Sequence, residues 1–212
     1  SGVISEKRLA HSVKKILSAK YKVGLAQYKP INTINLVSEL NRQKDDVLYQ
    51  NLMENAITLV QNTNNLLPLK HLELRKVAYV NMGTADASPF VKSLNKYTQV
   101  DKISANTLDQ LVSELSEYNT VVVGLHASNA SPWKPYQFTE KELVWLYEIA
   151  RTNTVVLTVF SKPYALNDLT DFSNIESIVM AYQNSPIAQK IAAQLIFGGL
   201  PFKGKLPVSI GS

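Results

Sequence analysis

Two apolar stretches decide the fold: Thr120 to Leu125, which reads TVVVGL, and Thr154 to Phe160, which reads TVVLTVF. Neither stretch alternates apolar and polar residues, and such runs are typical of strands that are buried on both faces. Between them, Thr139 and Glu142 form a Thr-x-x-Glu capping box, which predicts the start of a helix. A strand, a helix and a second buried strand predict a right-handed crossover in a parallel sheet.

The same alternation extends in both directions from this unit. Further parallel strands are predicted at 77–82, 100–104 and 177–181, with helices between them. The connection before 206–210 is too short for a crossover helix, so we expect that last strand to be antiparallel at an edge. The predicted fold class is α/β: a three-layer α/β/α sandwich with a mostly parallel six-stranded sheet, an antiparallel edge strand at the C-terminus, and an N-terminal helical extension.

The N-terminal extension begins with a predicted helix over residues 5–23. Ser5 is expected to cap this helix and Gly24 to end it. Its apolar side chains form one stripe that has no local partner before Pro30; they are Leu9, Val13, Ile16 and Leu17. Residues 30–45 are expected to be a linker, and a second helix is expected from about Asp46 to Gln61.

Composition and charge exclude several classes of protein. The 212 residues carry a net charge of +5, but residues 1–29 hold seven basic side chains and one acid, which leaves the remainder at −1. A nucleic-acid binder would show a basic face on its folded body, so this class is not expected. The chain has no cysteine, which excludes disulfides and thiol catalysis. No apolar run reaches the roughly 18 residues of a membrane span, and no apolar signal-peptide core follows the first residues.

Sequence motifs for nucleotide or serine-nucleophile chemistry are absent. The chain contains no G-x-G-x-x-G, no G-x-x-x-x-G-K-[ST] and no G-x-S-x-G. Its three histidines, His11, His71 and His126, have no second ligand at metal-binding spacing, so neither a metal nor a cofactor is expected. His126 stands apart because it leaves the strongest strand at the carboxyl end, where open α/β sheets bind ligands.

The loop that follows this strand is the candidate functional surface. It offers hydroxyls, an amide, a lysine and aromatic rings, a mixture suited to sugar recognition; the candidate cleft residues are His126, Asn129, Ser131, Trp133, Lys134 and Tyr136. The alternative is a rigid, proline-bracketed loop whose rings pack against a neighbouring domain. The loop contains no Asp or Glu, so a glycosidase built on paired carboxylates could not find its acid/base here.

Four segments, in order, resemble family 3 glycoside hydrolases, and specifically their C-terminal α/β-sandwich domain. The quoted stretches are ISEKRL (4–9) with VKKIL (13–17) and KYKVGL (20–25), AITLVQN (56–62) with LLPL (66–69), KPYAL (162–166), and Gly198 with GKLPV (204–208). Ala165 stands where an acid is common in the third segment.

The resemblance implies a domain order in which residues 1–29 supply the last helix of a catalytic barrel, 30–45 a linker and 46–212 the sandwich. It also implies a carbohydrate substrate, reached through the full-length enzyme and a barrel that holds the nucleophile. The barrel is missing from this chain, so the chain alone is expected to be inactive and to hold no catalytic residue.

Within the family, β-glucosidases take a glutamate acid/base from a loop of this domain, whereas β-N-acetylglucosaminidases use a His–Asp pair on the barrel. The acid-free loop therefore favours the second branch, and the resemblance would be consistent with an extracytoplasmic bacterial location. Two alternatives remain open: a stand-alone α/β binding module, and a structural or interaction domain with no link to sugar.

Overall fold

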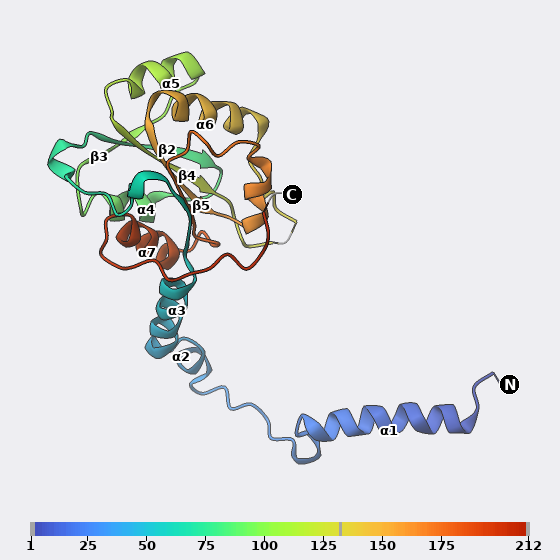
Figure 1. Ribbon diagram of the computed structural model, residues 1–212. Coiled ribbons are helices and arrows are strands. Elements are labelled where there is room, and N and C mark those ends of the chain that lie inside the picture. Colours follow the sequence, from blue (N-terminus) through green and yellow to red (C-terminus); the bar gives the residue numbers. More distant parts are fainter. Residues whose placement is uncertain (1–2, 132, 211–212) are drawn as a thin grey trace. The chain divides into compact units, whose positions relative to one another are not determined.

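The computed structural model describes residues 3–131 and 133–210, and they form two compact units that divide between Asp45 and Asp46. The terminal positions 1–2 and 211–212 of the expected domains, and Pro132 of the candidate loop, lie outside the described residues. The helices are α1 (Glu6–Lys22), α2 (Leu36–Leu40), α3 (Gln43–Ala56), α4 (Ser88–Leu94), α5 (Leu108–Leu115), α6 (Glu140–Thr152) and α7 (Pro186–Ile196), with 3-10 turns η1 (Leu25–Gln27), η2 (Thr63–Asn65), η3 (Leu72–Leu74) and η4 (Pro163–Asp168) (Figure 1).

The first unit contains α1 and α2. Ser5 caps α1 by accepting a hydrogen bond from the Arg8 amide, and Gly24 follows the helix with a φ of +81°, so both predicted ends are confirmed. No residue of α1 is buried, and the four side chains of its apolar stripe are 46–58% exposed. Among the described residues, no helix is both long enough and apolar enough to cross a membrane.

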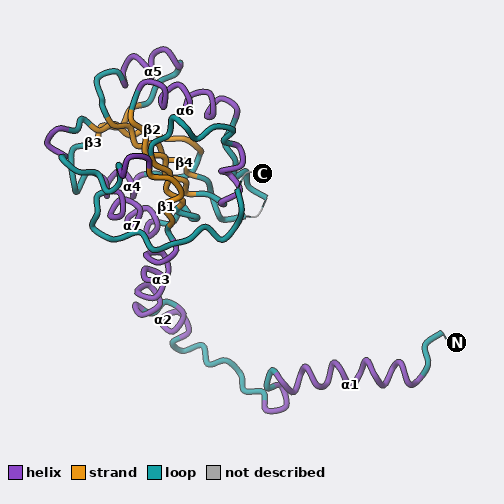
Figure 2. The backbone as a smooth tube through the Cα atoms, viewed as in Figure 1, coloured by secondary structure: helices purple, strands orange, loops and turns teal. Residues whose placement is uncertain are grey.

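The second unit is built on one six-stranded sheet with the order β1-β6-β5-β4-β2-β3 (Figure 2). The strands are β1 (Thr58–Asn62), β2 (Val77–Gly83), β3 (Val100–Ile103), β4 (Thr120–His126), β5 (Thr154–Phe160) and β6 (Ser177–Met180). All neighbours pair in parallel except β1, which is antiparallel to β6 at an edge of the sheet. The predicted fold class, a mostly parallel six-stranded sheet in an α/β/α sandwich, is confirmed.

The antiparallel edge strand lies at the other end of the domain sequence from the predicted one. Residues 206–210 form no strand: alternate side chains are partly buried, but the backbone bends at Pro207 and Val208 and makes no strand pairing. The edge position is taken by β1, and the helix expected over 46–61 ends at Ala56. The physical reason is that three of the four residues from Ile57 to Val60 are β-branched, which suits a pleated, half-buried surface better than a helix.

Helices cover both faces of the sheet and enclose two cores. Helices α4 and α7 pack on the face that presents Val77, Tyr79 and Val122. Helices α5 and α6 pack on the opposite face, against Ala78 and Val121. Because successive strand residues point to opposite faces, residue parity along each strand decides which core a side chain joins.

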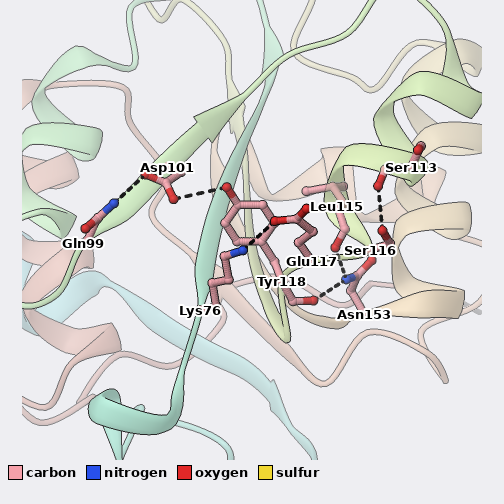
Figure 3. Close-up of polar contacts among 9 residues, drawn as sticks. All are labelled: Lys76, Gln99, Asp101, Ser113, Leu115, Ser116, Glu117, Tyr118 and Asn153. Atoms are coloured by element: carbon pink, nitrogen blue, oxygen red, sulfur yellow. Dashed lines mark hydrogen bonds and ion pairs between the residues drawn. The ribbon is translucent and has the colours of Figure 1, made fainter.

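Polar side chains fix the edge of the sheet at which the parallel strands begin (Figure 3). Lys76 Nζ lies 2.7 Å from Glu117 Oε2, and Tyr118 donates a hydrogen bond to Asp101. Asn153 donates its amide hydrogens to two carbonyl oxygens at the end of α5, those of Leu115 and Tyr118, at 3.0 and 2.8 Å. Hydrogen bonding raises the pKa of Lys76 and lowers that of Glu117. We call this set of contacts the amino-edge network.

Candidate functional site

His126 ends β4 and lies inside the protein rather than in a cleft. Its side chain shares the face of Val122, because the two residues are an even number of positions apart. The ring stacks on Phe160 with centroids 4.4 Å apart, and Phe90 covers it at 5.9 Å. His126 is 0% exposed. It therefore cannot touch a ligand directly in this arrangement.

Both ring nitrogens of His126 are hydrogen-bonded. Nδ1 lies 2.6 Å from Asn184 Oδ1, and Nε2 lies 2.9 Å from the Tyr79 hydroxyl. The Asn184 amide group donates to the Asp86 carbonyl oxygen, which identifies Oδ1 as the acceptor and places the imidazole hydrogen on Nδ1. Nε2 is then the acceptor that faces Tyr79, whose hydroxyl hydrogen is shared with Asn81 Oδ1.

Burial keeps this cluster uncharged. It lowers the pKa of His126 to about 4, against an opposing contribution from the Asn184 hydrogen bond. Burial also raises the pKa of the Tyr79 hydroxyl far above its ordinary value. A neutral imidazole that is hydrogen-bonded at both nitrogens and enclosed by aromatic rings holds its neighbours in place, and has no route for exchanging protons with a substrate.

Asn184 connects His126 to three loops at the carboxyl edge of the sheet. Its side chain reaches the loop after β2 through the Asp86 carbonyl oxygen, at 2.9 Å. Its backbone N–H donates to Asn129 Oδ1, also at 2.9 Å, in the loop after β4. Asn184 itself belongs to the loop after β6, and Gln189 of α7 donates to it and to the Asp86 carbonyl oxygen. One buried histidine thus braces three loops.

The predicted cleft residues occupy different positions. Asn129, Trp133 and Lys134 are exposed, and Trp133 is 91% exposed. Ser131 and Tyr136 are partly buried; Tyr136 is held by a hydrogen bond from the Ser161 hydroxyl to its carbonyl oxygen, and Lys162 Nζ lies over its ring at 4.8 Å. Only Asn129 is linked to the buried His126, through Asn184.

Three carboxylates near the loop already accept hydrogen bonds from backbone amides of this domain. Glu142 accepts from the amides of Gly83 and Thr139 at 2.6 and 2.8 Å. Asp168 accepts from the amide of Phe138 at 3.1 Å. Asp86 accepts from the hydroxyl and amide of Ser88, and these bonds lower its pKa. Within residues 3–131 and 133–210, no three His, Asp or Glu side chains gather as a metal site would require.

Sequence reasoning identified His126 but missed Asn184, Asp86 and Gln189. Asn184 is 58 residues from His126, so no local pattern connects them. The available signal was the position of Asn184 directly before the cap of α7, at the end of a buried strand, where an open α/β sheet gathers its ligand-contacting loops.

The sequence of this chain matches a known protein family. The family model for the glycosyl hydrolase family 3 C-terminal domain matches residues 57–212. A β-xylosidase of Formosa agariphila is 23% identical over 244 residues, covering 96% of this chain and 33% of its own length. A lysosomal beta glucosidase of Dictyostelium discoideum is 23% identical over 254 residues, covering 99% of this chain and 31% of its own length. The chain thus spans about a third of these curated relatives.

Solved structures share the fold. The beta-glucoside phosphorylase BglX bound to 2FGlc superposes with a TM-score of 0.76 at 18% identity, over 98% of this chain and 39% of that one. A family 3 β-N-acetylglucosaminidase from Paenibacillus sp. superposes with a TM-score of 0.67 at 18% identity, over 97% of this chain and 40% of that one. At these identities the likeness establishes the architecture and leaves the substrate open.

Proposed function

The chain belongs to the glycosyl hydrolase family 3 C-terminal domain family, and from that premise we propose that it is the second domain of a glycosidase acting on β-linked N-acetylglucosamine. The observation that carries this proposal is the loop between β4 and α6, which contains no Asp or Glu. Family members of the glucosidase type need a glutamate from a loop of this domain. An enzyme containing this domain would have to take its acid/base from the barrel, as the β-N-acetylglucosaminidase branch does.

The edge carboxylates support the same assignment. A general acid must be protonated and within reach of the leaving oxygen. The hydrogen bonds from Ser88 lower the pKa of Asp86 and so favour its ionised form. Glu142 and Asp168 are committed to backbone amides of the domain itself. None of these three side chains therefore has the arrangement of a protonated general acid that is free to approach a substrate.

The exposed stripe of α1 supports a barrel partner. Four large apolar side chains on one helix face stay in solvent in this chain. Burying each such side chain contributes about 1.5–3 kcal/mol, and most of the stability of helices in proteins comes from the packing of such an amphipathic face. A barrel on the same polypeptide would cover this stripe and supply the nucleophile, so the 212-residue chain alone should not hydrolyse glycosides.

The test uses the full-length protein, assayed with aryl β-N-acetylglucosaminide, β-glucoside and β-xyloside. We expect the N-acetylglucosaminide to be the best substrate. Asp86→Asn and Asp168→Asn should keep kcat within about threefold, because loss of a true acid/base costs about 10²–10⁴-fold. Glu148→Gln, near the C-terminal end of α6, is the matched control. Loss of turnover in Asp86→Asn or Asp168→Asn with rescue by azide would place the acid/base in this domain and overturn the proposal.

A β-glucosidase or β-xylosidase activity is the second candidate, favoured by the two curated relatives, which carry those names. The same substrate panel separates it from the first. Preference for the glucoside or the xyloside, with the carboxylate variants still active, would keep the domain assignment and replace the sugar.

A further inference from the structure

Regular elements enclose most of the His126 ring. Phe160 of β5 stacks on it, Phe90 of α4 lies against it, and the Tyr79 hydroxyl of β2 lies 2.9 Å from Nε2. The strand beside the ring leaves no room for water at Nε2, because a Cβ atom added at Gly124 would lie 2.6 Å from this nitrogen. The ring therefore cannot turn toward solvent while these elements stay in place.

The remaining partner of the ring belongs to a loop. Asn184 Oδ1 lies 2.6 Å from Nδ1, and Asn184 is part of the segment 182–185 between β6 and α7. The residues of this segment are partly or fully exposed, whereas Tyr79, Phe90 and Phe160 are buried. Movement of segment 182–185 is therefore the change that gives solvent access to Nδ1 without unpacking a strand or a helix.

The backbone of segment 182–185 is strained where the segment begins. Tyr182 has a φ of +61°, and the Gln183 amide donates across it to the Ala181 carbonyl oxygen at 2.6 Å. Such a turn is costly for a bulky residue and persists where the surrounding structure enforces it. An opening that breaks the bond between His126 and Asn184 can also relax this turn, which offsets part of the free energy that the opening costs.

The closed arrangement disfavours a charge on the ring. Burial lowers the pKa of His126 to about 4, against the Asn184 hydrogen bond and the Asp86 charge, which raise it, while the charge of Lys102 lowers it further. Tyr79 stays protonated, because burial raises its pKa. The described side chains packed around the ring carry no charge: they are Tyr79 from β2, Phe90 from α4, Phe160 from β5 and, through Asn184, Gln189 from α7. A ring exposed to water regains the ordinary pKa of 6.5.

We propose that His126 and segment 182–185 form an acid-sensitive latch: the segment opens locally, the ring takes up a proton from solvent, and the loops after β2, β4 and β6 lose their brace while the sheet stays folded. Proton uptake accompanies opening, because Asn184 and Tyr79 occupy the two ring nitrogens in the closed arrangement. The open state binds more protons, so lowering the pH from 7.5 to 4.5 should raise its population about 10- to 70-fold, the upper value applying to a fully solvated ring.

The test is amide hydrogen exchange of the 212-residue chain at pH 7.5 and pH 4.5, with protection corrected for the intrinsic pH dependence of exchange. Two amides report on the loops: Ala85 donates to the His126 carbonyl oxygen at 3.0 Å, and Asn184 donates to Asn129 Oδ1 at 2.9 Å. We expect their protection to fall about 10- to 70-fold at pH 4.5, with little dependence on urea. Amides of β4 and β5 should exchange through a larger, urea-dependent opening.

Two substitutions at the latch test its parts. His126→Asn keeps a donor toward Asn184 but has no group that titrates, so its loop protection should change less than about threefold between the two pH values. Asn184→Asp replaces the amide acceptor with a carboxylate, which favours the charged ring and should reduce the pH response at least about fivefold. If His126→Asn does not fold, Asn184→Asp decides alone. His71→Gln, at an exposed histidine, is the matched control and should keep the full response.

The exchange pattern decides between local and global opening. Loop amides that lose protection only together with those of β4 and β5, with the same urea dependence, would show that the ring is protonated only on global unfolding and would overturn the latch. A pH response that persists in both latch variants would assign it to other groups, with the same consequence. A response confined to the loops and diminished in both variants supports the latch, whether or not the full-length protein hydrolyses glycosides.

Discussion

The two edges of one sheet use polar side chains in opposite ways. At the amino edge, Lys76 and Glu117 pair in solvent and Asn153 serves nearby carbonyl oxygens. At the carboxyl edge, His126 is buried and uncharged, and Asn184 connects it by hydrogen bonds to three loops. The amino edge closes short turns, whereas at the carboxyl edge a buried histidine and its asparagine partner connect three loops. The order of the carboxyl-edge loops therefore depends on interior polar groups, and exposed ion pairs serve only the amino edge.

The largest expected difference between the edges concerns stability. His126→Ala removes a fully buried ring and leaves Tyr79 and Asn184 without their partner. We expect a loss of about 3–5 kcal/mol in the free energy of unfolding, as for a buried aromatic side chain. Glu117→Gln at the amino edge should cause no measurable loss, since exposed ion pairs contribute little. Urea denaturation of both variants checks this, and a loss below about 1 kcal/mol for His126→Ala would contradict the bracing role.

The pH dependence of stability should come from the carboxyl edge. The pKa of His126 falls from 6.5 to about 4 on folding, so the unfolded chain binds more protons between these values. The contribution of the neutral His126 ring to the free energy of unfolding is complete above pH 6.5. It decreases by about 3 kcal/mol as the pH falls toward 4. The groups around the ring are Tyr79 and Asn184, with the charges of Asp86 and Lys102 farther out.

Unfolding midpoints at pH 7.5 and pH 4.5 measure this difference. His126→Phe should show a clearly flatter profile over that window, although less stable at pH 7.5, because it has no group to protonate there. An equally steep profile in His126→Phe would assign the pH dependence to other groups.

Two asparagines provide a matched pair of smaller substitutions. Asn184→Ala and Asn153→Ala each remove an amide with several hydrogen bonds, and each should cost about 1–3 kcal/mol. Their local effects should differ. Asn184→Ala should speed hydrogen exchange in the loops after β2 and β4, whereas Asn153→Ala should affect the end of α5. Identical exchange patterns would remove the distinction between the edges.

The sequence predicted the central strands of the sheet better than its antiparallel edge strand. Val-rich runs such as 120–125 and 154–160 are strands in the structure, because burial on both faces leaves little alternative. The predicted caps at Ser5 and Thr139 are confirmed, since capping is a local interaction. The antiparallel strand was misplaced, because the pairing of β1 with β6 joins segments more than 100 residues apart.

The same limit applies to the candidate site. The sequence predicts that His126 lies at the end of a strand. Because His126 is an even number of residues from Val122, the two side chains share a face of the sheet, and this could have indicated a buried ring. Its partner Asn184 was not readable, because long-range side-chain contacts depend on the assembled sheet. Local patterns thus place His126 at the carboxyl edge of the sheet, and tertiary structure decides which atoms meet there.

The smallest expected effect on stability is at the tip of the candidate loop. Trp133 is 91% exposed, so Trp133→Ala should leave the thermal midpoint of the 212-residue chain unchanged. If the ring instead stacks on a sugar in the full-length enzyme, the variant should raise KM about 2- to 10-fold, which corresponds to about 0.5–1.5 kcal/mol of stacking. Lys134→Ala, the neighbouring exposed residue, is the control for general loop disturbance. A change in the thermal midpoint of the full-length protein, with KM unchanged, would favour the other interpretation, in which Trp133 packs against a neighbouring domain.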